Sequence, residues 1–198
     1  GGRAVASTDS ATWDGADAIV AAAVEAFGRL DIVVNNATAG RTADLWRFTE
    51  AEWDRTIDVN LKGYFAMIRA AVPHLAQHRV GAIVNTSSAS GFGHPSHSAY
   101  AAAKEGLVGL TRTAAMELGR FGIRCNAIRP VALTQQVAEY REQTVEWRRL
   151  MDLTMGTGTT GMDPAVFSPA RIAPLVVWLC TDAAAGVNGR TLAVMGNR

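Results

Sequence analysis

The sequence predicts a single α/β domain, residues 1–198, built on a doubly wound parallel β-sheet with helices on both faces. Three observations support this prediction. Short aliphatic runs such as LDIVVNNA and GAIVNTSS alternate with longer segments of helical periodicity. The aliphatic runs are nearly continuous, as expected for strands covered on both faces. A length of 198 residues and a hydrophobic content of 48% suit one domain with a sizeable core.

Composition excludes several classes of partner. The formal charge of +1 comes from 19 basic and 18 acidic residues spread along the chain, so no nucleic acid is expected as a partner. No apolar run reaches the roughly 20 residues that span a bilayer, and the first residues lack a signal-peptide pattern. We therefore expect a cytoplasmic protein without membrane contact. Cys125 and Cys180 have no metal-ligand spacing, which favours buried reduced thiols and no metal site.

The first third of the chain contains three predicted elements. Ala4–Ala6, followed by the polar run Ser7–Ser10, is typical of a strand end running into a turn. Apolar residues at helical spacing predict a helix from Asp14 to Phe27, and Gly28 is placed to end it. The aliphatic run Leu30–Ala37 predicts a strand buried on both faces.

The middle of the chain is predicted to be mainly helical. Thr49 is a candidate N-cap with acidic residues in the first turn after it. The helical pattern runs to about Gln77, as two helices that meet near Asp58–Asn60. GAIVNTSS is the next predicted strand, and Ser98 to about Gly119 is a long helix rich in Ala, Leu and Val.

The last third resumes the alternation after an interruption. IRCNAIRP predicts a short strand that ends at Pro130. Residues 131–168 interrupt the pattern with a polar helical piece, Val137–Met151, followed by a Gly- and Thr-rich run. Ile172–Cys180 predicts another helix, and Thr191–Met195 predicts a closing strand.

Tyr100 and Lys104 are four residues apart, which places both side chains on one face of the predicted helix. A nearby cation favours the phenolate form, so this phenol could act as a general acid or base. The same spacing also occurs in ordinary surface pairs. Here the pair follows a strand that ends in Ser87 and Ser88, and open α/β sheets bind ligands at the carboxyl ends of their strands. The position therefore favours a catalytic role.

Three motifs, LDIVVNNAT, IDVNLKG and NTSSASG…AYAAAK, occur in an order and spacing that resemble the short-chain dehydrogenase/reductase family. The resemblance runs nearly end to end. It implies a Rossmann-like fold and an oxidoreductase that interconverts a secondary alcohol and a ketone, with NAD or NADP as cofactor. It also implies a homodimer or homotetramer, because family members associate through the helices that carry Asn60 and Tyr100.

The resemblance assigns catalytic roles to four residues. Tyr100 would exchange the proton at the substrate oxygen, and Lys104 would bind the nicotinamide ribose and lower the pKa of the phenol. Asn60 would kink its helix and hold a water molecule that relays protons. A strand-end serine would hold the substrate oxygen. The usual family spacing selects Ser87, whereas the local Ser-Ser-x-x-Gly pattern selects Ser88, which we favour because loops absorb deletions more readily than strands shift register.

The resemblance also implies cofactor contacts. Tyr100 and Lys104 would be joined in the cofactor site by Asp9 at the adenine, Asn35 and Ala37 at the adenosine ribose, and Leu133 and Thr134 at the nicotinamide carboxamide. Two positions depart from the family pattern. Thr38 stands where the family has glycine, which is expected to weaken cofactor affinity, and Val131 stands where many members have glycine.

The family's first βαβ segment, with its glycine-rich phosphate turn, has no counterpart in this sequence. We therefore expect a partial domain in which the strand Leu30–Ala37 has an unpaired apolar edge. The run Gly156–Gly161 has the letters G-x-G-x-x-G, but a polar helical pattern precedes it and Asp163-Pro164 follows it. We interpret that run as part of a substrate loop of about residues 131–168.

The substrate prediction rests on three stretches, GGRAVASTDS, SSASG and SPARIAPLVVWLCTDAAAGVNGR. They resemble the (3R)-hydroxyacyl-CoA dehydrogenase units of multifunctional β-oxidation enzymes, which implies a 3-hydroxyacyl thioester substrate. Two alternatives remain open: a 3-oxoacyl carrier-protein reductase, and a non-catalytic oligomer-forming chain that lacks the phosphate turn. His94 and His97 precede Tyr100 and could reach a substrate from that loop, but solvated loop residues are the favoured interpretation.

Overall fold

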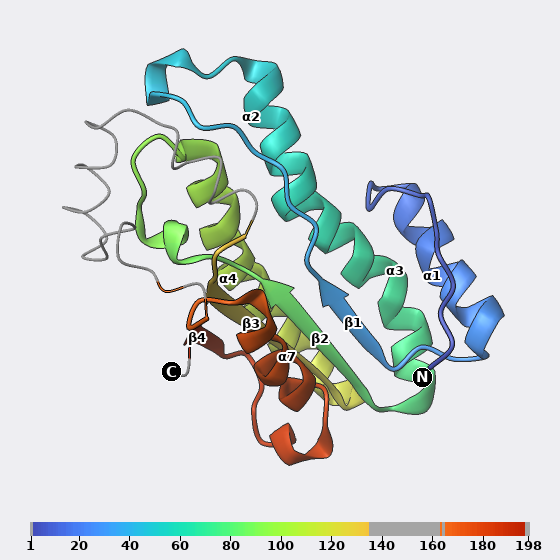
Figure 1. Cartoon of the computed structure of the whole chain (residues 1–198). Coiled ribbons are helices and arrows are strands. Elements are labelled where there is room, and N and C mark those ends of the chain that lie inside the picture. The colour runs from blue at the N-terminus through green and yellow to red at the C-terminus, as the bar shows by residue number, and fades with distance from the viewer. Residues whose placement is uncertain (1, 135–162, 164, 197–198) are drawn as a thin grey trace.

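The computed structural model describes residues 2–134, 163 and 165–196, and Figure 1 shows their arrangement. The predicted helix Val137–Met151 and the Gly156–Gly161 run lie outside these described residues. The predicted substrate loop, residues 131–168, is described only at its two ends.

Four parallel strands form one sheet in the order β1-β2-β3-β4. The strands are β1 (Ile32–Asn35), β2 (Gly81–Thr86), β3 (Ile123–Val131) and β4 (Thr191–Met195). This arrangement confirms the predicted parallel α/β sheet. Strand β3 continues one residue beyond the predicted end, since Val131 pairs with Met195. Because all four strands are parallel, their carboxyl ends lie at the same edge of the sheet.

Helices cover both faces of the sheet (Figure 1). The helices are α1 (Gly15–Phe27), α2 (Glu50–Ile57), α3 (Gly63–His78), α4 (Ser98–Leu118) and α7 (Ala173–Leu179). Helices α1, α3 and α4 pack on one face, around a cluster that includes Val20, Val33, Leu75, Ile83, Leu118 and Ile123. Helix α7 packs on the other face, around Val84, Ile128, Leu179 and Val194.

The two helices predicted between Thr49 and Gln77 meet where expected. Helix α2 begins with a capping box, in which the Thr49 hydroxyl accepts from the backbone N–H of Glu52 and the Glu52 carboxylate accepts from the backbone N–H of Thr49. A π-helical turn, η2 (Asp58–Lys62), joins α2 to α3. Such turns insert an extra residue into a helix and often occur at functional sites. This one places Asn60 in the interior.

The strand predicted at Ala4–Ala6 is wrong. Residues 2–10 form no strand, and Val5 is 54% exposed. In Figure 1 this segment runs along α1, where the Arg3 guanidinium donates to the carbonyl of Ala26 at 3.5 Å. An extended segment becomes a strand only when a neighbouring strand receives its backbone hydrogen bonds, and here a helix is the neighbour.

The prediction that the strand after Leu30 is buried on both faces is also wrong. Along β1 the residues alternate, with Ile32 and Val34 44% and 45% exposed and Val33 and Asn35 buried. Val33 faces α1 and α3. Among the described residues, the cluster beneath α7 includes residues of β2, β3 and β4 but none of β1, and Ile32 and Val34 remain partly exposed. Within the described residues β1 pairs with β2 alone, which makes it an edge strand with an apolar face.

Candidate active site

The carboxyl ends of β1, β2 and β3 bring the predicted site residues to one edge of the sheet. The end of β1 leads to Ala37, the end of β2 to Ser87 and Ser88, and the end of β3 to Leu133 and Thr134. The first turns of α4 cross this edge with Tyr100 and Lys104.

Lys104 lies at the centre of this arrangement. Its side chain is 1% exposed, and its Nζ donates to the carbonyl oxygen of Thr86 at 2.8 Å and to the hydroxyl of Tyr64 at 3.2 Å. Its Nζ also lies 5.4 Å from the ring centroid of Tyr100, as the one-turn spacing predicts. The structure therefore brings the predicted phenol and amine together.

Tyr64 is a site residue that the sequence analysis missed. It is buried on α3, and its hydroxyl donates to the carbonyl oxygen of Ala37 at 2.9 Å. The signal was present in the sequence, because Tyr64 follows Asn60 by four residues on the same helical segment. Tyr100 and Lys104 have the same spacing on α4.

Burial sets the protonation of these groups. It lowers the pKa of Lys104 from its ordinary 10.5 to about 7, because removing an ammonium from water disfavours the charged form. Burial raises the pKa of Tyr64, and the nearby Tyr100 raises it further. No carboxylate among the described residues forms an ion pair with Lys104. A buried amine that gains and loses a proton near neutral pH therefore lies beside two phenols.

The two candidate serines have different surroundings. Ser87 is buried, and its hydroxyl donates to the backbone carbonyl of Lys104 at 2.6 Å. Ser88 is partly exposed, and its hydroxyl accepts from the backbone N–H of Ser90 at 3.1 Å, at the start of η3 (Ala89–Phe92). Ser87 thus fastens α4 to the end of β2, whereas Ser88 is the serine that solvent reaches.

Arg129 is a second residue that the sequence analysis missed. This buried cation on β3 donates to the carbonyl of Ser88 at 2.9 Å and to the Glu105 carboxylate at 2.6 Å. Its guanidinium carbon lies 3.9 Å from the ring centroid of Phe92. Arg129 therefore fixes the turn that carries Ser88 against the helix that carries Lys104. A buried arginine with a carboxylate partner is detectable only in three dimensions, because the two residues are far apart in the sequence.

Asn60 makes three side-chain hydrogen bonds with its surroundings. Its amide nitrogen donates to the carbonyl of Thr56 at 2.9 Å and to the carbonyl of Ala39. Its amide oxygen accepts from the Thr38 hydroxyl at 2.9 Å. The side chain that replaces the expected glycine thus turns toward Asn60. Asn60 ties the segment after β1 to the π-helical turn.

The predicted cofactor contacts differ in their placement. The Asn35 amide is buried in the sheet and donates to the Asn85 amide oxygen at 2.9 Å. The backbone N–H of Leu133 donates to the carbonyl of Phe167 at 2.8 Å, and Thr134 is exposed. Asp9 is exposed in the segment before α1, where its carboxylate accepts from the Ser7 hydroxyl at 2.8 Å. Ala37 alone of this set is tied to Lys104, through Tyr64.

The expectation that His94 and His97 are solvated is wrong. His97 is 5% exposed and His94 is partly buried. The segment after β1 covers this loop, since the backbone N–H of Ala43 donates to the carbonyl of Ser96 at 3.0 Å. The His97 ring meets the Tyr100 ring edge-on, with centroids 5.9 Å apart. Burial lowers the pKa of His97 to about 4, so this ring is neutral at pH 7.

The Lys104 amine at this edge suits a ligand with hydroxyl groups. In the described part of the chain, two bonds occupy Lys104 Nζ, so a protonated amine retains a third donor. The backbone at Gly40 passes close to Tyr100, because a Cβ added there would lie 3.7 Å from the ring. A ligand held here would therefore contact the segment after β1 and the phenol together.

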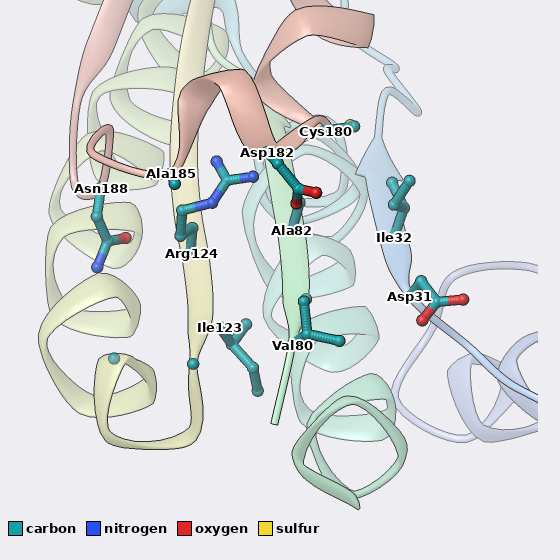
Figure 2. Close-up of a pocket in the computed structure, with 13 residues that line it drawn as sticks. Asp31, Ile32, Val80, Ala82, Ile123, Arg124, Cys180, Asp182, Ala185 and Asn188 are labelled. Carbon is teal, nitrogen blue, oxygen red and sulfur yellow. The ribbon is translucent and has the colours of Figure 1, made fainter. Parts of the chain in front are cut away.

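A cavity of about 400 Å³ lies at the opposite, amino-terminal edge of the sheet (Figure 2). Its lining includes Asp31, Ile32, Arg124, Asp182 and Asn188. The Arg124 guanidinium donates to the carbonyl of Leu179 at 2.8 Å, and the Asn188 amide oxygen accepts from the backbone N–H of Cys125 at 2.9 Å. Arg124 and Asn188 therefore have structural roles, because their side chains bind backbone groups of other segments. The cavity shares no lining residue with the Tyr100–Lys104 site.

The described residues contain neither a metal-ligand cluster nor a membrane-spanning helix. No group of three or more His, Cys, Asp or Glu side chains there is arranged to hold a metal ion. No helix there combines the length and apolar character that crossing a membrane requires. Both cysteines are free, with Cys125 buried and Cys180 partly buried.

The sequence and the fold both match known proteins. The family model described as Enoyl-(Acyl carrier protein) reductase matches residues 1–196. A 3-oxoacyl-(acyl-carrier-protein) reductase from Thermotoga maritima is 34% identical over 179 residues, which cover 90% of this chain and 70% of that protein. A hydroxy(phenyl)methylsuccinyl-CoA dehydrogenase subunit from Thauera aromatica is 37% identical over 186 residues, which cover 92% of this chain and 70% of that subunit.

A solved structure adds the three-dimensional comparison. A proposed short-chain alcohol dehydrogenase from Sinorhizobium meliloti superposes with a TM-score of 0.84 and 33% sequence identity. The superposition covers 98% of this chain and 75% of that one. The similarity therefore extends through the sheet, its helices and the edge that carries Tyr100 and Lys104.

Proposed function

The chain belongs to the short-chain dehydrogenase/reductase family of oxidoreductases, and we propose that it interconverts a secondary alcohol and a ketone with NAD or NADP. The proposal rests mainly on one observation. The Tyr100 ring lies beside the buried amine of Lys104, at the carboxyl ends of the strands of a parallel sheet. Oxidoreductases of this family use nicotinamide cofactors, and the third N–H of a protonated Lys104 suits a hydroxyl of the nicotinamide ribose.

Each catalytic residue has a role that its position supports. In the reducing direction Tyr100 gives its phenolic proton to the substrate oxygen as the carbonyl carbon is reduced, and in the oxidising direction it takes the proton back. The Ser88 hydroxyl orients that oxygen. Lys104 holds the ribose hydroxyls and keeps a positive charge near the phenol. When bound, the nicotinamide ring supplies or accepts the hydride.

The remaining residues hold the cofactor or the parts that surround it. Asn60 contributes by fixing the segment after β1, since its amide bonds Thr38, Ala39 and Thr56. The residues proposed to line the cofactor, besides Tyr100 and Lys104, are Asp9, Asn35, Ala37, Leu133 and Thr134. Asn35 would act through its backbone, because its side chain is used within the sheet.

We assign the substrate to the acyl thioesters, with a 3-hydroxyacyl thioester as the leading member. Both relatives described above are named for thioester substrates, one on an acyl carrier protein and one on coenzyme A. A 3-oxoacyl carrier-protein reductase is therefore the closest alternative. A homodimer or homotetramer is the proposed assembly, and a non-catalytic, oligomer-forming role is the alternative from another class.

Nucleotide binding and turnover test this proposal together. We expect isothermal titration to give micromolar binding of NADH or NADPH. We further expect the purified chain to reduce a 3-oxoacyl-CoA with loss of absorbance at the nicotinamide band. Faster turnover of the carrier-protein thioester would instead support the reductase alternative. Absence of nucleotide binding by a folded, oligomeric chain would overturn the enzymatic proposal in favour of the non-catalytic role.

The choice between the two serines is tested by a matched pair of variants. Ser88→Ala should lower kcat about 10²-fold with little change in the unfolding free energy, because it removes a group that orients the substrate oxygen. Ser87→Ala should mainly lower the unfolding free energy, by about 1–2 kcal/mol, because it removes a buried hydrogen bond to α4. Steady-state kinetics and urea titrations measure both effects. The reverse assignment of effects would identify Ser87 as the active serine.

A further inference from the structure

The Tyr64 hydroxyl bridges two parts of the candidate site. It accepts from Lys104 Nζ at 3.2 Å and donates to the carbonyl oxygen of Ala37 at 2.9 Å. A phenol has a single proton, so a proton directed at Ala37 leaves an oxygen lone pair facing the amine. We propose that Tyr64 is a positioning residue for the reaction, holding the Lys104 amine in place and favouring its protonated form. This inference rests on the proposed function.

The groups that face the Lys104 amine explain why one hydroxyl matters. Helix α3 contributes Tyr64, helix α4 contributes the ring of Tyr100, and β2 contributes the carbonyl of Thr86. The nearest carboxylate along α4, Glu105, is bonded to Arg129 of β3 instead. In the described part of the chain, two neutral oxygens therefore accept from a buried ammonium that has no counter-ion. Loss of either oxygen removes a large share of its stabilisation.

The Tyr64 hydroxyl can accept a hydrogen bond from Lys104 throughout the pH range in which Lys104 titrates. Burial raises the pKa of its phenol, so it stays neutral, whereas burial lowers the pKa of Lys104 to about 7. Lys104 is thus the partner that titrates. Removing the acceptor disfavours the ammonium further, so the midpoint of Lys104 should move to lower pH.

The chain offers an unusually direct measurement, because its only lysines are Lys62 and Lys104. Protein labelled with ¹³C at the lysine ε-carbon gives two NMR signals, whose shifts can be followed against pH without cofactor. Tyr64→Phe keeps the ring and removes only the hydroxyl. We expect its Lys104 midpoint to fall by about one pH unit from the wild-type value, the effect of losing one hydrogen bond to a charge.

Thr111→Val is the matched control. Thr111 is a buried residue of α4 whose hydroxyl accepts from the Asn85 amide at 3.0 Å, away from the amine. This variant also removes one buried hydroxyl, and it should leave the Lys104 midpoint in place. The exposed Lys62 supplies a reference signal that should be the same in all three proteins.

The pH profile of kcat provides the second readout. The part of the kcat–pH curve that depends on the ionisation of Lys104 should shift to lower pH in Tyr64→Phe, as the NMR midpoint does. At pH 7, kcat should fall about tenfold. A wild-type chain that binds no nucleotide would overturn the proposed function, and the NMR comparison would still decide the role of Tyr64. Equal Lys104 midpoints in wild type and Tyr64→Phe would overturn the present inference, whatever the activity.

If Tyr64→Phe fails to fold, a measurement on the wild-type protein still tests the inference. Wild-type protein labelled at the tyrosine ζ-carbon should show a Tyr64 signal that shifts with pH at the same midpoint as Lys104. Tyr100→Phe, which removes one of the chain's three tyrosine signals, assists the assignment. A Tyr64 signal that does not respond when Lys104 titrates would overturn the inference.

Discussion

Tyr100→Phe is expected to lower kcat by about 10³-fold while the protein remains folded and binds nucleotide. The phenol is the proposed proton donor and acceptor at the substrate oxygen, and general acid–base groups typically contribute 10²–10⁴-fold. The ring stays, so its edge contact with His97 and its position near Lys104 are preserved. Steady-state kinetics with the thioester substrate measure the effect.

The control for this variant is the nucleotide affinity. The dissociation constant of NADH should change far less than kcat, because the variant keeps the Tyr100 ring in the cofactor site and the Lys104 amine keeps its bonds to Thr86 and Tyr64. A small change in affinity with a large change in kcat is typical of a group that acts in the transition state. Tyr100→Phe with unchanged turnover would show that the proposed mechanism is wrong.

Gly122→Ala is expected to cost about 3–5 kcal/mol of unfolding free energy. Gly122 has a φ of 73°, and a Cβ there would lie 2.1 Å from the carbonyl oxygen of Arg79. The substitution therefore combines a left-handed conformation, costing about 1–2 kcal/mol, with a backbone clash that the turn cannot relieve locally. Gly122 lies in the turn before β3, and Arg79 lies in the turn before β2. Moving these turns apart would therefore disturb the pairing of β2 with β3.

Gly28→Ala separates these two causes. Gly28 ends α1 with a φ of 81°, but a Cβ there would meet nothing within 4 Å. Its cost should be limited to the conformational term, about 1–2 kcal/mol. Urea titrations of the two variants measure the difference. Equal losses would mean that the approach of the two turns contributes nothing to stability.

The local features of the fold were readable from the sequence because short-range chemistry determines them. The N-cap at Thr49 and the end of α1 at Gly28 involve residues within four positions of each other. The aliphatic runs predicted the strands at Gly81–Thr86 and Thr191–Met195, and these have the predicted starting points. The spacing of Tyr100 and Lys104 likewise placed the phenol and the amine on one helical face.

Other predictions depended on what neighbouring segments would cover. Ala4–Ala6 has the composition of a strand but lies beside α1, where no strand among the described residues receives its hydrogen bonds. The aliphatic run after Leu30 suggests burial on both faces, but among the described residues the cluster beneath α7 includes none of β1. The sequence around His97 indicates a solvated loop residue, but the segment after β1 covers this loop. Composition indicates whether a segment can be buried, but it does not specify which other segments will pack against it.

The sequence by itself therefore determined the parallel α/β sheet and the Tyr100–Lys104 pair, since both follow from periodicity and spacing. Only the tertiary structure decided how that pair is held. Tyr64 reaches Lys104 across 40 positions of sequence, and Arg129 reaches Ser88 across 41. Burial then moves the pKa of Lys104 toward neutrality. Hydrogen bonds between distant segments and the exclusion of water arise only when helices and strands pack together. Local sequence patterns therefore cannot predict them.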